Sequence, residues 1–96
     1  MRPSAAVRQH REAIHRVAIR FRVVNPRVFG SALRGDDMEH SDLDLLVDAL
    51  PGTTLFDLGG LRDELEHLLG VHVDVVTPRD LPAKFRDIVL AEARPV

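Results

Sequence analysis

The stretch Phe29–Asp48 reads F-G-S-A-L-R-G-D-D-M-E-H-S-D-L-D-L-L-V-D and joins a Gly-Ser turn to a strand that carries two carboxylates. Because side chains two residues apart on a strand point to the same face, Asp42 and Asp44 lie side by side, while Leu43 and Leu45 face the other way. Two carboxylates that close repel each other. A divalent cation with oxygen ligands would relieve this repulsion, so the pair predicts a metal site.

The turn before this strand supplies a candidate phosphate site. Gly30 allows the backbone to turn tightly and to approach a ligand closely. The N–H groups that follow it and the Ser31 hydroxyl can hold a phosphate, above all if Ser31 begins a short helix. Arg34 could reach phosphate oxygens from the same turn, or it could form a local salt bridge with Asp36 or Asp37. The stretch therefore predicts a site for a metal–triphosphate.

The composition limits the class of protein. The chain has 96 residues, no cysteine and a net charge of −2. We expect residues 1–96 to form one soluble, cytoplasmic domain without membrane contact, because no apolar run approaches the length of a transmembrane segment. The lack of cysteine excludes disulfides and thiolate zinc sites. The negative net charge and the absence of Trp and Tyr argue against direct binding of nucleic acid.

Hydrophobic periodicity predicts the elements. An amphipathic helix is expected over about 4–22, capped by Ser4 and ended by Asn25-Pro26. The other expected elements are a short strand at 28–29, a strand at 43–48, a helix from 55 or 57 to 69 that ends at Gly70, a strand at 71–76 and a helix at 81–94 with Phe85, Ile88, Val89 and Leu90 inward.

This order predicts an α/β (α+β) fold with a small mixed sheet of about three strands and helices packed on one face. The packed face would bury Leu43, Leu45, Val47, Val71, Val73 and Val75. The other face would expose Asp42, Asp44 and Asp74. If strands 43–48 and 71–76 are neighbours, Asp74 lies within reach of the other two carboxylates, and together they describe a two-metal site for phosphoryl transfer.

These residues resemble a known family. Gly30-Ser31, a gap of ten residues, Asp42-Leu43-Asp44-Leu45 and a distal Asp74 between valines are similar to the signature of nucleotidyltransferases related to DNA polymerase β. Within that superfamily the short chain resembles the minimal nucleotidyltransferases, the MntA-type antitoxins that pair with HepT-like toxins of the HEPN class. The resemblance covers about residues 5–93. Leu33 departs from the commoner alanine of the G-S-x-A-R-G run, away from the chemistry.

The resemblance implies the role of each site residue. Gly30 and Ser31 would hold the β- and γ-phosphates of ATP. Asp42 and Asp44 would bind two Mg²⁺ ions, and Asp74 would bind the ion next to the attacking hydroxyl. A hydroxyl attacks the α-phosphorus and pyrophosphate leaves. In MntA-type antitoxins the acceptor is a tyrosine hydroxyl of the toxin, which is AMPylated and silenced.

Other residues near the site have plainer interpretations. We expect Ser41 to brace the start of the Asp-bearing strand and to contact substrate only secondarily. Asp36, Asp37 and Glu39 are interpreted as a solvated loop, with contact to a basic partner as the alternative. His72 is interpreted as a surface histidine on the same face as Asp74, where it could also touch a nucleotide. The alternative function is a non-catalytic module that neutralises its toxin partner by occlusion and keeps the carboxylates only as a cation or nucleotide site.

Overall fold

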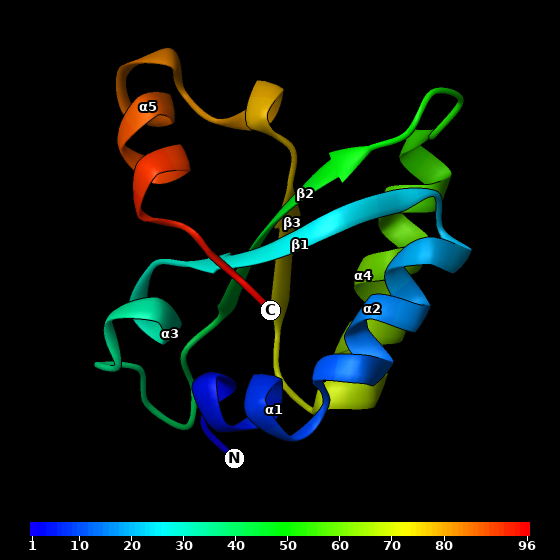
Figure 1. Ribbon diagram of the computed structural model, residues 1–96. Helices are drawn as coiled ribbons and strands as arrows, with labels where there is room; N and C mark the ends of the chain where they lie inside the picture. The colour runs from blue at the N-terminus through cyan, green and yellow to red at the C-terminus, as the bar shows by residue number, and fades with distance from the viewer.

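A four-stranded sheet with the strand order β3-β2-β1-β4 organises the computed structural model, which describes residues 1–96 (Figure 1). Its strands are β1 (Val23–Phe29), β2 (Leu43–Ala49), β3 (Val73–Val76) and β4 (Arg94–Pro95). β2 runs antiparallel to β1 and parallel to β3, so the sheet is mixed. The predicted fold class is confirmed, with one more strand than expected: β4 pairs with the outer edge of β1.

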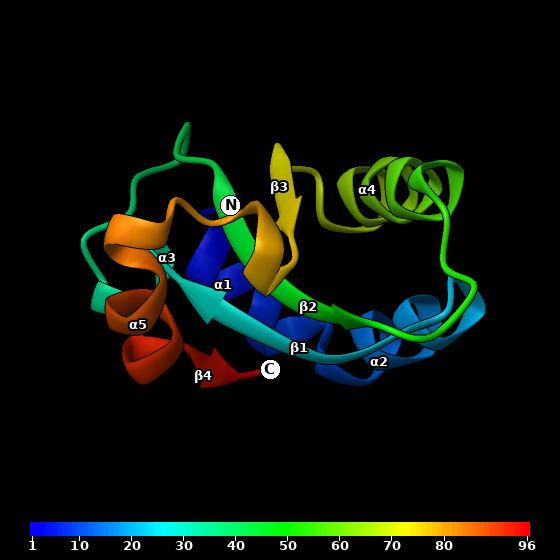
Figure 2. The same cartoon turned by 90° about the horizontal axis from the view of Figure 1, so that it is seen from above.

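Three helices cover one face of this sheet: α1 (Pro3–Gln9), α2 (Arg11–Arg20) and α4 (Leu55–Leu69) (Figures 1 and 2). Alternation along β2 directs Leu43, Leu45 and Val47 into this layer, as predicted. Ile14 from α2 and Leu61 and Leu65 from α4 meet Leu43 and Leu45 there, and all are essentially inaccessible to solvent. This cluster is the main core, and it fixes the position of the strands that carry the acidic residues.

Helix α4 shows how local sequence and packing agree. Thr54 and Asp57 form a reciprocal capping box at its start, and Gly70 ends it in the left-handed conformation, as predicted. Gly60, inside the helix, is needed for packing, because a Cβ there would lie 2.6 Å from Cε1 of Phe21. The glycine therefore lets the end of α2 lie against α4.

The N-terminal prediction was wrong in three respects. The single helix at 4–22 is two helices separated at His10, and Ser4 lies inside α1, whose N-cap is Arg2. Asn25-Pro26 does not end the helix but forms a bulge within β1, where the pairing with β2 shifts by one residue. Asn25 has a positive φ of 56° there, a conformation that asparagine adopts more readily than most residues.

A second, smaller apolar cluster lies on the opposite face of the sheet. Leu46 of β2 is buried there with Leu81 and Ala93, which lie on either side of α5 (Ala83–Glu92). The two remaining short helices are α3 (Ser31–Arg34) and the 3₁₀ turn η1 (Pro78–Asp80). The expectation that all helices share one face therefore fails for α5, which covers part of the face that carries the carboxylates.

The expected inward face of the last helix is confirmed only for Val89, which packs against this cluster. Phe85 and Ile88 are 50% and 55% exposed, and no residue of α5 is fully buried. Arg86 also attaches the helix, because its guanidinium donates to the carbonyls of Pro78 and Leu81 at 2.8 and 3.0 Å. No helix of the structure has both the length and the apolar character needed to cross a membrane.

Candidate active site

The turn after β1 is shaped around Asp44. Gly30 has φ 74° and ψ −149° and is the N-cap of α3, so Ser31 begins a helical turn, as the sequence predicts. A Cβ on Gly30 would overlap Oδ2 of Asp44 and would lie 3.3 Å from its Cγ. Only glycine satisfies both the backbone conformation and this close approach. The first N–H groups of a helix have no intrahelical acceptor, so those of α3 are available to an anion beside Asp44.

The register of the sheet places the site residues in one row. Phe29 of β1 is paired with Asp44 of β2, and Asp44 is paired with Asp74 of β3. The Gly30-Ser31 turn, Asp44 and Asp74 therefore lie in that order across three neighbouring strands. Asp74 is exposed on the sheet face opposite the main core, so the predicted juxtaposition of the two aspartates is observed.

Asp44 is the electrostatic centre of this row. Partial burial raises the pKa of its carboxyl, and the negative charges of Asp74 and Asp42 and a hydrogen bond with Asp74 raise the pKa further, while Arg34 opposes the shift. The ionised form of Asp44 is thus disfavoured by neighbours of the same charge. Such a group is stabilised by a positive charge placed between the carboxylates.

The three carboxylates do not close into a cage. No three acidic or histidine side chains converge closely enough to be ready ligands for an ion in this structure. Asp44 and Asp74 are the adjacent pair, and Asp42 precedes β2 on the same side of the strand as Asp44. The all-oxygen donor set on one face suits a hard divalent ion that also takes ligands from a phosphate.

Arg34 and Ser41 occupy the local positions that the sequence allowed. Nε of Arg34 lies 3.4 Å from Oδ2 of Asp36, and both side chains are more than 60% exposed, so this ion pair is weak and leaves Arg34 able to move. The Ser41 hydroxyl accepts a hydrogen bond from the Met38 N–H at 2.8 Å. Ser41 therefore braces the loop that leads into β2, as expected.

Asp37 corrects the interpretation of residues 36–39 as a solvated loop. Asp37 is only 3% exposed, and its carboxylate accepts hydrogen bonds from the N–H and hydroxyl of Ser4 at 2.8 and 3.0 Å. Ser4 lies in the first turn of α1, so Asp37 caps a helix more than thirty residues away in the sequence. The acidic loop is thereby attached to the helical layer, which fixes the approach to β2.

Two residues of α4 were missed by sequence reasoning. Arg62 and Glu66 line a hollow together with Asp42, His72 and Asp74. Oε2 of Glu66 accepts from the Val73 N–H at 3.0 Å and lies 3.4 Å from Nδ1 of His72. The periodicity of α4 shows only that these two positions are outside its apolar stripe. It gives no sign that they lie beside the carboxylates.

Comparison with known proteins shows which family the chain resembles. The sequence model of the family described as "Nucleotidyltransferase domain" matches residues 8–96. The protein adenylyltransferase MntA of Thermococcus cleftensis is 41% identical over 73 residues, which are 76% of this chain and 74% of that protein. A solved minimal nucleotidyltransferase superposes with a TM-score of 0.87 at 46% identity, covering 97% of this chain and 95% of the other.

A more distant structure shares the fold. A chain from the crystal structure of a toxin–antitoxin with AMP-PNP superposes with a TM-score of 0.66 at 21% identity, covering 84% of this chain and 70% of that one. At this identity the likeness concerns the fold. The neighbour shows that the arrangement of strands and helices described above occurs in a complex crystallised with an ATP analogue.

Proposed function

The chain belongs to the nucleotidyltransferase domain family and works as an enzyme of that class, and we propose that it transfers AMP from ATP to a tyrosine hydroxyl of a HEPN-type toxin partner. The modification silences the toxin, so the chain acts as its antitoxin. Adenylyl transfer is supported by the similarity to MntA, and a toxin partner by the naming of that relative and by the toxin–antitoxin neighbour. The tyrosine and the HEPN class rest on the resemblance of the sequence motifs.

One observation carries the proposal: the row formed by the Gly30-Ser31 turn, Asp44 and Asp74 across β1, β2 and β3. The turn binds the β- and γ-phosphates through its free N–H groups and the Ser31 hydroxyl. Because Gly30 lies against Asp44, a triphosphate bound at the turn would have its α-phosphorus close to the carboxylates. Asp74, the next group in the row, lies where it can orient the attacking hydroxyl and accept its proton.

The donor set of Asp42, Asp44 and Asp74 suits magnesium, and the proposal assigns it two ions. All the donors are oxygens, and partial burial and the charges of its neighbours disfavour the ionised form of Asp44. When bound, Mg²⁺ supplies neutralisation of the triphosphate charge and a template for in-line displacement. The chain's own part is to hold these carboxylates on adjacent strands at a fixed register, where the burial of Leu43, Leu45 and Val73 prevents slippage. Catalysis is thus chiefly positioning and charge stabilisation.

Transfer of label tests this function. The purified chain is incubated with the toxin, MgCl₂ and ATP labelled on the α-phosphate. Label is expected on the toxin, and it should be lost when the tyrosine is replaced by phenylalanine. Asp42→Asn should abolish transfer. Asp63→Asn is the matched control, because Asp63 is 70% exposed and lines the hollow between α2 and α4, not the one that contains Asp42 and Asp74. Its pair with Arg62 is exposed and therefore weak.

The same variants separate transfer from neutralisation by occlusion. If the chain only covers the toxin, Asp42→Asn should still protect cells that express the toxin, because the docking surface is unchanged. If transfer is the mechanism, Asp42→Asn should lose protection while Asp63→Asn keeps it. Labelling of the toxin that persists in Asp42→Asn would refute the assignment of the site.

A further inference from the structure

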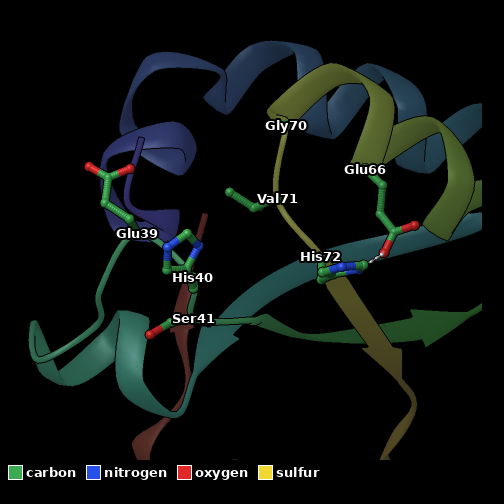
Figure 3. Close-up of a pocket in the computed structure, with 7 residues that line it drawn as sticks. All are labelled: Glu39, His40, Ser41, Glu66, Gly70, Val71 and His72. Atoms are coloured by element: carbon green, nitrogen blue, oxygen red, sulfur yellow. Dashed lines mark ion pairs between the residues drawn. The ribbon is translucent and has the colours of Figure 1, made fainter.

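A cleft of about 540 Å³ opens at the N-terminal ends of β2 and β3, outside the phosphate-binding turn (Figure 3). His40 and Ser41 form one wall, and Val71 and His72 form the opposite wall, with Glu39 and Glu66 towards the outside. The lining residues are Glu39, His40, Ser41, Glu66, Gly70, Val71 and His72. Nothing in the phosphate chemistry described above uses this cleft.

The cleft continues to the carboxylates. The hollow that contains Asp42 and Asp74 shares two lining residues with it, Glu66 and His72. Ser41 is the residue before Asp42, so the wall of the cleft leads directly to the start of β2. A group that enters between His40 and His72 therefore reaches the two carboxylates without crossing the sheet.

The geometry of phosphoryl transfer determines the side of the row from which the acceptor approaches. In phosphoryl transfer the attacking and leaving oxygens lie roughly in line. The leaving pyrophosphate is held at the Gly30-Ser31 turn, on the β1 side of Asp44. The attacking oxygen must therefore arrive from the opposite side of the row, which is the side of Asp74 and β3. The hollow that contains Asp42 and Asp74 lies on that side, and the cleft joins it through Glu66 and His72.

We infer that this cleft admits the acceptor, a phenolic side chain of a polypeptide, and that His72 positions its ring. This inference rests on the proposed function. The acceptor oxygen forms a bond to the α-phosphorus, the bond from that phosphorus to the bridging oxygen breaks, pyrophosphate leaves with the electron pair, and the hydroxyl proton passes to Asp74. A phenol suits the cleft because its rigid ring carries the hydroxyl past the rim while the backbone stays outside.

The contacts of His72 suit it to positioning an aromatic ring. Its side chain is 86% exposed, and its one polar contact is Glu66, 3.4 Å from Nδ1. Glu66 is itself fixed by the Val73 N–H. The imidazole is thus held in orientation at its edge and keeps a free face for stacking on an aromatic ring. Figure 3 shows the ring of His72 across the cleft from that of His40.

Titration of the whole chain with N-acetyl-tyrosinamide tests the cleft without requiring catalysis. With Mg²⁺ and a non-hydrolysable ATP analogue present, saturable amide shifts are expected at His40, Val71 and His72. His72→Ala should weaken binding of this probe about fivefold, since an aromatic pair contributes on the order of 1 kcal/mol. His72→Phe should restore binding, because a flat ring is retained. His67→Ala, an exposed histidine on α4 outside the cleft, should have no effect.

Three results would overturn the inference: no saturable shift, shifts centred on the exposed Phe85 and Ile88 of α5, or equal loss of probe and nucleotide binding in His72→Ala.

In the transfer assay, His72→Ala should raise the KM for the toxin about fivefold with little change in kcat. If the wild-type chain transfers no label, the proposed function is contradicted. The probe titration would still show whether a phenol binds in the cleft. Equal KM values for wild type and His72→Ala contradict the cleft alone.

Discussion

At the scale of single residues, Asp44 has the least favourable electrostatic environment in the proposed site. It is half-buried between a turn that contacts it and two carboxylates that repel it. A folded chain retains such a group at a cost in stability, which a bound cation offsets. Asp44 is therefore the residue whose substitution should most clearly separate activity from stability.

Asp44→Asn should reduce transfer of label by at least about a hundredfold, because a charged ligand at the centre of the site is lost. Its melting temperature should stay equal to that of the wild type or rise, since the amide has no charge for Asp42 and Asp74 to repel. Thermal unfolding without Mg²⁺ measures the second effect. A variant that unfolds earlier and also keeps its activity would contradict this view of Asp44.

Gly30 and Gly35 form a matched pair for testing the turn. Both have positive φ, 74° and 80°, so alanine at either position costs about 1 kcal/mol or more of conformational strain. Only Gly30 lies against Asp44, whereas a Cβ on Gly35 would meet nothing within 4 Å. Gly30→Ala should therefore lose ATP binding by calorimetry as well as stability, and Gly35→Ala should lose stability alone.

At the scale of elements, long-range capping determines how α1 is attached. Arg2, the N-cap of α1, provides no side-chain hydrogen bond, and Asp37 supplies the acceptor from the loop before β2. Burial raises the pKa of Asp37, but the hydrogen bonds from Ser4 and the charge of Arg2 outweigh it, so the pKa is lowered. The ionised form of Asp37 thus stabilises the fold.

Asp37→Asn should reduce the free energy of unfolding by about 1–3 kcal/mol at pH 7, because a buried charge-assisted hydrogen bond is lost. Since the folded-state pKa is lowered, the contribution of Asp37 is complete above the ordinary aspartate pKa of about 3.9 and is lost as the pH falls through the folded-state value. Denaturation by urea at pH 7 and at acid pH measures the change.

The matched control is Asp36→Asn, which alters only an exposed pair with Arg34 and should be nearly neutral. A difference between wild type and Asp37→Asn that stays constant down to the lowest pH would show that shape, and not charge, is the contribution of Asp37.

At the scale of the whole molecule, one face of the sheet is buried under helices and the other is largely accessible. α1, α2 and α4 close one face over the main core, and the other face keeps the carboxylates accessible beside the small cluster around Leu46. Figure 2 shows α5 and β3 lying apart on either side of β2.

Removal of divalent ions tests this arrangement as a unit. Treatment with EDTA should abolish transfer of label, and excess Mg²⁺ should restore it, because the carboxylates need the ion to bind a triphosphate. Asp42→Glu should need more Mg²⁺ for half-maximal activity, since the longer side chain moves the ligand. Transfer that continues in EDTA would contradict the magnesium proposal while leaving the adenylyl transfer itself unaffected.

Much of the fold and site could be predicted from local patterns. The alternation of Asp42, Leu43, Asp44 and Leu45 predicts a strand with one acidic side, and the capped leucine stripe predicts α4; both are present. The pairing of Asp44 with Asp74 followed from assuming that two strands were neighbours. The prediction of a single helix over residues 4–22 was wrong because the break at His10 does not interrupt the apolar periodicity.

The sequence alone determined the strand that carries the carboxylates, the glycine that the turn requires and the family to which both point, because these depend on residues close together in the chain. Only the tertiary structure decided that Asp37 is buried beneath Ser4, that α5 leaves Phe85 exposed, and that His40 and His72 face each other across a cleft. Each of these depends on contacts between segments far apart in sequence, whose distances no local pattern of hydrophobicity encodes.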